Sequence, residues 1–178
     1  MRTKVRDDIF LTELRPSDKA AMLEHLSERS EIHEHTLRIP YPYTKADADK
    51  FLRYVAGQTA SCGRPLTFAI RDENDFMIGI CGFDDLVLGK SHKAEIGYWV
   101  AKPYWGQGIA TAVVAAMTRM ASDELHLAKV TAHVFAHNAA SAQVLEKNGF
   151  ELEGYLKKQF LKEGKFIDAK AYGLLLPR

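Results

Sequence analysis

Two glycines, Gly106 and Gly108, stand between a strand-like segment and an apolar, helix-like segment, within residues 105–111. The first N–H groups of a helix have no partner inside the helix and lie at the positive end of its dipole, so an anion is favoured there. Glycine lets the backbone approach a phosphate closely and adopt a positive φ angle. The pattern therefore predicts a phosphate-binding loop, with a plain strand-to-helix turn as the alternative.

Two common phosphate loops fit this stretch poorly. A Walker loop needs a Gly-Lys-Ser/Thr step, and residues 105–111 hold no lysine. A dinucleotide fingerprint needs a small residue shortly after Gly108 and an acidic residue about twenty positions further on. The chain has Thr111 and Ala128 at those places. The remaining candidate is the pyrophosphate loop of coenzyme A acetyltransferases.

Residues 105–110 resemble the signature of the GNAT superfamily, Gln/Arg-x-x-Gly-x-Gly/Ala. They match at Gly108 and Ala110, and Trp105 replaces the first polar residue. The wider chain resembles the ribosomal-protein N-terminal acetyltransferases of that superfamily, the RimJ/RimL-type group. The blocks that carry this resemblance, in the family's order and spacing, are 97–100, 104–111, 138–141 and 144–150. The resemblance covers nearly the whole chain and implies direct acetyl transfer from acetyl-CoA to a primary amine, without a metal.

The resemblance also implies a coenzyme-binding set. In this superfamily two central parallel strands splay apart, and Trp99 and Val100 would lie at that splay, with the Val100 N–H facing the thioester carbonyl. Backbone amides of residues 107–111 would hold the pyrophosphate, and Asn138 would contact the pantetheine. The implied coenzyme-binding residues are Trp99, Val100, Trp105, Gly106, Gln107, Gly108, Ile109, Ala110, Thr111, Asn138 and Ser141.

Acetyl transfer from a thioester needs a neutral amine, a donor for the carbonyl oxygen and a proton for the leaving thiolate. Glu95 is the one carboxylate in an otherwise apolar strand, and the resemblance makes it a general base acting through water. The alternative is a solvent-facing glutamate near the start of the strand. The resemblance makes Ser141 the acid, because no tyrosine occurs between Asn138 and Gly149. Plain helix capping by Asn138, and water as the acid, are the alternatives.

The remaining polar residues carry weaker predictions. The histidine pairs His33/His35 and His133/His137 lack further ligands at zinc-like spacing, so we expect structural or solvated roles and no metal. His137 precedes Asn138 and is a candidate secondary proton relay. Four lysines lie near the end of the chain, and a solvated face or contact with an acidic substrate would explain them: Lys157, Lys158, Lys162 and Lys165.

The type of amine decides how much help from a base is needed. At pH ~7.5 an α-amine is roughly one-third neutral, whereas a free lysine is neutral only about once in a thousand. Family likeness favours a peptide or protein N-terminus, with polyamines and amine antibiotics as competing acceptors. A non-catalytic module that senses acyl-CoA is the other class of function. The resemblance also allows a homodimer.

The elements that must position these residues follow from hydrophobic periodicity. We expect a single α/β domain over residues 1–178, with a twisted mixed sheet of about seven strands and about four helices. The predicted strands are 9–14, 66–71, 76–83, 93–100, 129–135, 150–155 and 166–176. The predicted helices are 17–26, capped by Ser17 or Asp18, then 46–56, capped by Thr44, then 109–121 and 138–147. Residues 33–43 are predicted to be irregular.

Composition excludes several classes of function. The formal net charge is +1 over 178 residues, so no basic field indicates nucleic acid. Residues 1–10 lack the apolar stretch of a signal peptide, and no run of about 18 apolar residues predicts a membrane span. Cys62 and Cys81 are too few for a disulfide framework and are expected to be small, half-buried hydrophobes. A cytoplasmic location is therefore expected.

Overall fold

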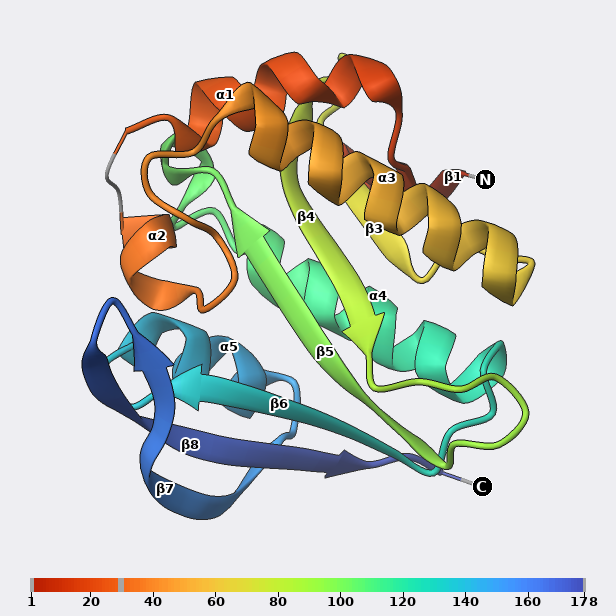
Figure 1. Cartoon of the computed structure of the whole chain (residues 1–178). Coiled ribbons are helices and arrows are strands. Elements are labelled where there is room, and N and C mark those ends of the chain that lie inside the picture. Colours follow the sequence, from red (N-terminus) through yellow and green to blue (C-terminus); the bar gives the residue numbers. More distant parts are fainter. Residues whose placement is uncertain (1, 29–30, 178) are drawn as a thin grey trace. The chain divides into compact units, whose positions relative to one another are not determined.

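A computed structural model describes residues 2–28 and 31–177 of the chain. It shows an α/β fold with a mixed sheet (Figure 1), which confirms the predicted class. The strands are β1 (Arg2–Arg6), β2 (Ile9–Glu13), β3 (Thr67–Arg71), β4 (Met77–Asp84), β5 (Lys93–Val100), β6 (Lys129–Phe135), β7 (Glu151–Lys162) and β8 (Lys165–Leu175). The helices are α1 (Lys19–Leu26), α2 (Glu31–His35), α3 (Lys45–Cys62), α4 (Ile109–Asp123) and α5 (Ala139–Lys147).

The strand order is β1-β2-β3-β4-β5-β6-β8-β7, eight strands where about seven were predicted. The described residues fall into two compact units. The first takes Met1–Glu34, Arg38–Gly82 and Tyr98–Ile109, and the second takes His35–Leu37, Phe83–Gly97 and Ala110–Arg178. The single domain over the whole chain stays a prediction.

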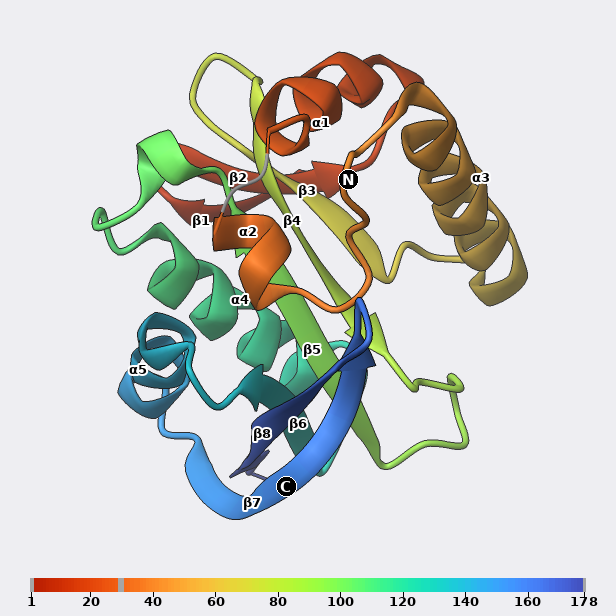
Figure 2. The same ribbon diagram turned by 60° about the vertical axis from the view of Figure 1, so that its left-hand side comes forward.

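In the first unit, β1 to β4 form an antiparallel series in which each strand pairs with the next. Every residue of β3 is buried, as expected for a central strand. Helices α1 and α3 pack against each other, and Figure 2 shows β1, β2 and β3 side by side. The shared core of these helices and strands consists of Ala21, Met22, Leu26, Ile32, Tyr43, Ala48, Ala69, Met77 and Ile80.

Thr44 caps α3 as predicted. Its hydroxyl accepts from the Asp47 N–H at 3.3 Å, and the Asp47 carboxylate accepts from the Thr44 N–H at 2.8 Å, which completes a capping box. The helix runs to Cys62, well beyond the predicted end at residue 56. It ends at Gly63, which takes the left-handed conformation, with φ 67°, that favours glycine after a helix.

Two other predictions for the first unit were wrong, and one strand was not predicted. Asp18 does not cap α1 with its side chain, because its carboxylate accepts from the Arg15 N–H and from the buried Arg71 guanidinium. The segment predicted to be irregular begins inside the helix α2, which is five residues long and so gives little periodicity to recognise. Strand β1 was missed, since an edge strand rich in charged side chains lacks the apolar alternation of a half-buried strand.

Strands β5 and β6 keep their predicted bounds. The part of β5 that belongs to the second unit, up to Gly97, pairs in parallel with β6, from Lys93–Lys129 to Glu95–Thr131. Strand β6 pairs antiparallel with β8 over its full length. Strands β7 and β8 form a long hairpin, which turns at Glu163 and Gly164 as predicted. None of the helices in the described ranges combines the length and the hydropathy that a bilayer crossing requires. Cys81 is buried and Cys62 half-buried, both as free thiols.

Candidate active site

The glycine loop of the first unit is an open backbone cradle. Gly106 and Gly108 have φ angles of 73° and 72°, in the left-handed region that side chains rarely adopt. A Cβ built on either residue meets nothing within 4 Å, and residues 105–108 are all exposed. Glycine is therefore required here by backbone conformation and not by packing. The space above the loop is free for a ligand that approaches the main chain.

Arg6 of the missed strand β1 holds this loop in place. Its Nη1 donates to the Gln107 carbonyl at 2.7 Å, and its Nε and Nη2 donate to the Asp8 carboxylate at 2.6 and 2.8 Å. The bond with Asp8 raises the pKa of Arg6, so the guanidinium stays charged. The C=O and N–H of a trans peptide point in opposite directions, so this bond turns the Gly108 N–H away from Arg6.

The end of β5 is fixed by three contacts within the first unit. The Trp105 indole N–H donates to the Val100 carbonyl at 2.6 Å, and the Ala101 N–H donates to the Ile78 carbonyl at 2.7 Å. In β4, a Cβ built on Gly79 would lie 2.3 Å from the Trp99 carbonyl oxygen. Gly79 thus permits a close approach of the two backbones that any other residue would prevent. These contacts orient the peptides of Trp99 and Val100.

The side chains of the predicted coenzyme set are largely engaged in the fold. Trp99 packs against the core of the first unit, with its ring 6.4 Å from that of His25. Ile109 is buried, and the Trp105 indole N–H is bonded to the Val100 carbonyl. What residues 99–109 can offer a coenzyme is therefore mainly backbone. This agrees with an anion cradle made of N–H groups.

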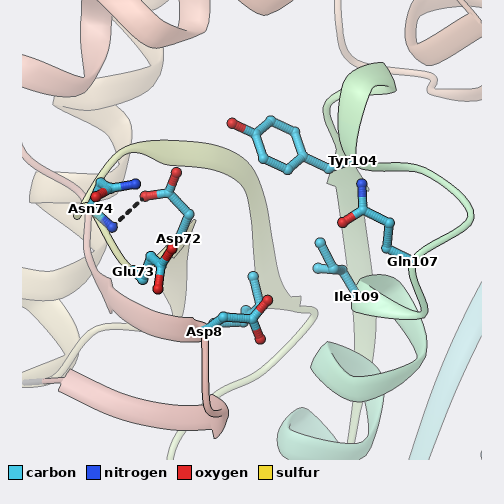
Figure 3. A pocket seen from close by; sticks show the side chains of 8 residues that line it. Asp8, Asp72, Glu73, Asn74, Tyr104, Gln107 and Ile109 are labelled. Carbon is cyan, nitrogen blue, oxygen red and sulfur yellow. Dashed lines mark hydrogen bonds between the residues drawn. The ribbon is translucent and has the colours of Figure 1, made fainter.

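A cavity of about 180 Å³ opens beside this loop in the first unit. Figure 3 shows Tyr104, Gln107 and Ile109 on one side of it, facing Asp8 and the turn of Asp72, Glu73 and Asn74. Burial, and then the nearby Asp72 carboxylate, raise the pKa of Tyr104, so its hydroxyl stays neutral. Three acidic side chains in the lining would repel a pyrophosphate. We therefore do not assign the coenzyme to this cavity.

In the second unit, α5 begins as predicted. The Asn138 side chain accepts from the Ser141 N–H at 3.1 Å, which is the N-cap bond. At the other end of α5, the Asn148 amide donates to the Thr111 carbonyl in the first turn of α4 at 3.2 Å. Ala110 and Thr111 are half-buried, and so are Asn138 and Ser141. The capping role of Asn138 is observed, and contact with pantetheine stays a prediction.

Glu95 has a partner that the sequence did not predict. The Nδ1 atom of His133 lies 3.0 Å from Glu95 Oε2, and each side chain is 27% exposed. Glu95 pairs in register with Thr131 across the parallel strands, and His133 stands on the same face of β6 as Thr131. Glu95 is thus neither a fully solvated residue nor an isolated base. It is one half of a carboxylate–imidazole pair.

An aromatic ring packs against the His133 side of this pair. The ring of Phe160 in β7 meets His133 edge to face, with centroids 6.2 Å apart, and also packs on Phe135 at 5.7 Å. The ring of His137 is tilted against that of Phe135 and lies 5.4 Å from the ring of His35. The relay candidate His137 is thus linked to the pair through Phe135 and Phe160, and its relay role stays a prediction.

A bulge in β7 places Phe160. Between the pairs Leu156–Ala169 and Phe160–Ile167, residues 157–159 face Asp168 alone. The Asp168 carboxylate accepts from the Lys158 N–H at 2.7 Å and from the Tyr155 hydroxyl at 2.9 Å, and both bonds lower its pKa.

Of the four clustered lysines, Lys162 donates to the Thr36 carbonyl and Lys158 lies over the Phe166 ring. Across residues 2–28 and 31–177, no group of three or more potential metal ligands is present.

Comparison with known proteins assigns the family. A family model described as an acetyltransferase (GNAT) domain matches residues 8–151, and the chain belongs to this family. The N-acetyltransferase YoaA of Bacillus subtilis (strain 168) is 33% identical over 108 residues, which are 61% of this chain and 60% of that protein. The ribosomal protein uS5-alanine N-acetyltransferase of Escherichia coli (strain K12) is 30% identical over 106 residues, or 60% and 54%. The chain spans less than two-thirds of either relative.

A solved structure extends the likeness to the fold. RimL, a ribosomal alpha-N-protein acetyltransferase in complex with coenzyme A, superposes with a TM-score of 0.88. The superposition covers 99% of this chain and 98% of that chain at 20% identity. The predicted resemblance to the RimJ/RimL-type group is thus confirmed.

Sequence reasoning missed three residues that position the site: Arg6, Gly79 and His133. Arg6 gave no signal, because its strand was not recognised. A glycine inside the apolar run of residues 76–83 was a signal for a close backbone approach. For His133 the signal was available, because a polar residue on one face of a strand parallel to that of Glu95 indicates proximity.

Proposed function

We propose that this chain transfers the acetyl group of acetyl-CoA directly to a primary amine. The observation that carries the proposal is the open glycine loop ahead of α4, in a chain that belongs to the GNAT family. Two left-handed glycines with free space above them suit a pyrophosphate, which main-chain N–H groups bind best when no side chain intervenes. A plain strand-to-helix turn would not need two such glycines only two positions apart.

The coenzyme would be held by the set that the resemblance implies. In this proposal the amides of residues 107–111 bind the pyrophosphate, and Asn138 contacts the pantetheine. The Val100 N–H donates to the thioester carbonyl, where negative charge develops during attack. Support comes from the fixed end of β5, since Trp105 restrains the Val100 carbonyl and Gly79 admits the Trp99 peptide. Trp105 acts through this restraint and not as a phosphate ligand.

Glu95 and Ser141 are the proposed catalytic residues. Glu95 supplies the carboxylate that promotes loss of the proton from the attacking amine. Ser141 in the first turn of α5 protonates the departing thiolate. The partial exposure of Glu95 supports its role, because a half-buried carboxylate with one partner can exchange protons with a reacting group.

The acceptor is proposed to be the α-amine of a peptide or protein. Relatives of this chain include enzymes named for acetylation of ribosomal proteins, at an alanine in one case and a serine in another. An α-amine is substantially neutral near pH 7.5 and needs only modest help from a base. The same relatives support action in the cytoplasm. A small amine is the competing acceptor, since another relative is an L-amino acid N-acetyltransferase.

Thermal unfolding with and without acetyl-CoA tests coenzyme binding. With a Kd of about 10 μM, 1 mM acetyl-CoA would stabilise the fold by about 2.7 kcal/mol. For a chain of this length that is a rise in Tm of roughly 5–10 °C. ATP and NAD serve as controls. No rise with acetyl-CoA, or a larger one with ATP or NAD, would overturn the proposal.

A matched pair of variants tests the loop itself. Gly108 and Gly89 both have φ 72°, and a Cβ on either meets nothing within 4 Å. Gly108→Val and Gly89→Val therefore carry similar backbone strain, but only the first lies in the loop. We expect Gly108→Val to lose the rise in Tm with acetyl-CoA and Gly89→Val to keep it. A rise retained in Gly108→Val would mean that the loop is only a turn.

Release of free thiol tests turnover and the acceptor. Peptides with a free N-terminus, the same peptides with a blocked N-terminus and a free lysine, spermidine and amine antibiotics are compared at equal concentration. Release with the free N-terminal peptides alone supports the proposed acceptor class. Binding of acetyl-CoA without release for any amine would favour the non-catalytic module.

A further inference from the structure

The hydrogen bond between Glu95 and His133 shows which imidazole nitrogen carries the hydrogen. An ionised carboxylate can only accept a hydrogen bond, so the imidazole nitrogen that contacts Glu95 Oε2 carries the hydrogen. In a neutral imidazole the other nitrogen is then an acceptor. Glu95 therefore fixes the tautomer of His133, with Nδ1 protonated and Nε2 basic.

The basic nitrogen is left open. Within residues 2–28 and 31–177, the His133 ring makes no hydrogen bond besides the one to Glu95, and Glu95 has no second side-chain partner. The ring is 27% exposed, so Nε2 is not sealed in the core. A nitrogen that has no protein partner and is not sealed in the core is available to a reacting group.

Packing holds the imidazole in this orientation. Phe160 meets the ring at an interplanar angle of 89°, and Phe135 packs against Phe160. The ring thus has a carboxylate at Nδ1, an aromatic wall and an open Nε2. The same relation of carboxylate, imidazole and open nitrogen makes histidine a general base in unrelated hydrolases.

We infer that His133 Nε2 is the atom that takes the proton of the acceptor amine, and that Glu95 is its positioning partner. The inference rests on the proposed function and refines the role of Glu95 in it. As the amine nitrogen bonds to the thioester carbon, it loses one proton to Nε2, and the resulting imidazolium is stabilised by Glu95. The C–S bond breaks and the sulfur takes a proton from Ser141 or water. His133 then gives its proton to solvent, and solvent returns one proton to Ser141 or to the hydroxide, so that no net proton is gained or lost.

This assignment matches the strength of base that the reaction needs. Free imidazole has a pKa near 6.5 and a glutamate carboxyl near 4.3. A base works best when its pKa lies near the working pH, so an imidazole is better suited than a carboxylate to an amine that reacts near neutrality.

Three variants test the inference in the thiol-release assay with the best amine found for the wild-type chain. His133→Ala should lower kcat by about 10²–10⁴-fold, the usual contribution of a general base. Added imidazole should restore part of the rate. Glu95→Gln should lower kcat less, because the imidazole remains. His92→Ala, which removes an exposed histidine just before β5, is the control and should keep the wild-type rate.

The outcomes separate the inference from the proposed function. The rise in Tm with acetyl-CoA is measured for each variant, and only variants that keep it are interpreted. A wild-type rate in His133→Ala, a larger loss in Glu95→Gln than in His133→Ala, or a loss that imidazole does not restore would each overturn the inference. In all three cases the wild-type chain still releases thiol and the proposed function stands. A wild-type chain that releases no thiol with any amine contradicts the proposed function itself.

Discussion

Two carboxylate–nitrogen pairs, one in each unit, differ in their burial and in the number of hydrogen bonds that they make. In the first unit, both oxygens of Asp18 accept from Arg71 at 2.8 Å, and Arg71 Nε donates to the Thr12 hydroxyl at 2.6 Å. The Asp18 and Arg71 side chains are 5% and 2% exposed. In the second unit, Glu95 and His133 share one bond, and each is 27% exposed.

The two pairs differ in how completely their polar atoms are hydrogen-bonded, and this difference indicates different roles. A buried pair is tolerable only when its polar atoms are satisfied, because each unpaired charge would be costly in a low-dielectric interior. Arg71 meets this condition through a two-pronged bond, which also suits its planar guanidinium. The Glu95–His133 pair leaves one imidazole nitrogen without a protein partner in the part of the chain that the structure describes. The first pair is saturated, and the second is the one for which we propose a role in proton transfer.

The largest expected effect is on stability. Asp18→Ala removes the bidentate partner of the buried Arg71 and leaves it only the Asp75 carboxylate at 3.7 Å, which costs about 3–5 kcal/mol. Thermal unfolding should show a fall in Tm of roughly 10 °C. Asp7→Ala removes an exposed carboxylate that pairs with Lys4 and should leave Tm unchanged. Glu95→Gln is the reciprocal control, with slower turnover and a nearly unchanged Tm. A small change in Asp18→Ala, or a large one in Glu95→Gln, would break the comparison.

A smaller effect is expected at Ser141, near the start of α5. Replacement by Ala keeps the backbone N–H that bonds to Asn138, so the helix start is preserved. A thiol is acidic enough to leave with little help, so kcat should fall by no more than about tenfold. Gln143→Ala, an exposed change on the same helix, is the control. An unchanged kcat would assign the acid to water and remove Ser141 from the proposed catalytic residues.

The smallest effect concerns the bulge that places Phe160. The bonds from Lys158 and Tyr155 lower the pKa of Asp168, so its contribution to stability is present above the ordinary aspartate pKa of about 3.9. That contribution is lost as the pH falls through the lowered pKa. Asp168→Ala should therefore have a lower Tm than wild type at pH ~7, and the two values should converge in acid. Tyr155→Phe removes one of the two bonds and should show part of the difference. A deficit independent of pH would contradict the linkage.

Much of this architecture could be predicted because its signals are local. The bounds of β5 and β6 follow from apolar runs, and those of α5 from an Asn cap and an Asn-Gly stop. The glycine loop was found because its residues adjoin in the chain. His133 was predicted to be a structural or solvated residue because its contact with Glu95 depends on the register of two strands far apart in sequence. Strand β1 and helix α2 are held by tertiary contacts, for which short segments carry no reliable pattern.

The hydrogen bond from Arg6 to Gln107 links strand β1 to the loop that is proposed to hold the coenzyme. Deleting this strand, or fusing a tag to it, can therefore change the conformation of the loop. A loss of acetyl-CoA affinity in such a truncated or tagged protein would then be caused by the altered strand and would not be a property of the natural chain. Conversely, the first strand offers a place to tune coenzyme affinity without touching a single residue of the glycine loop.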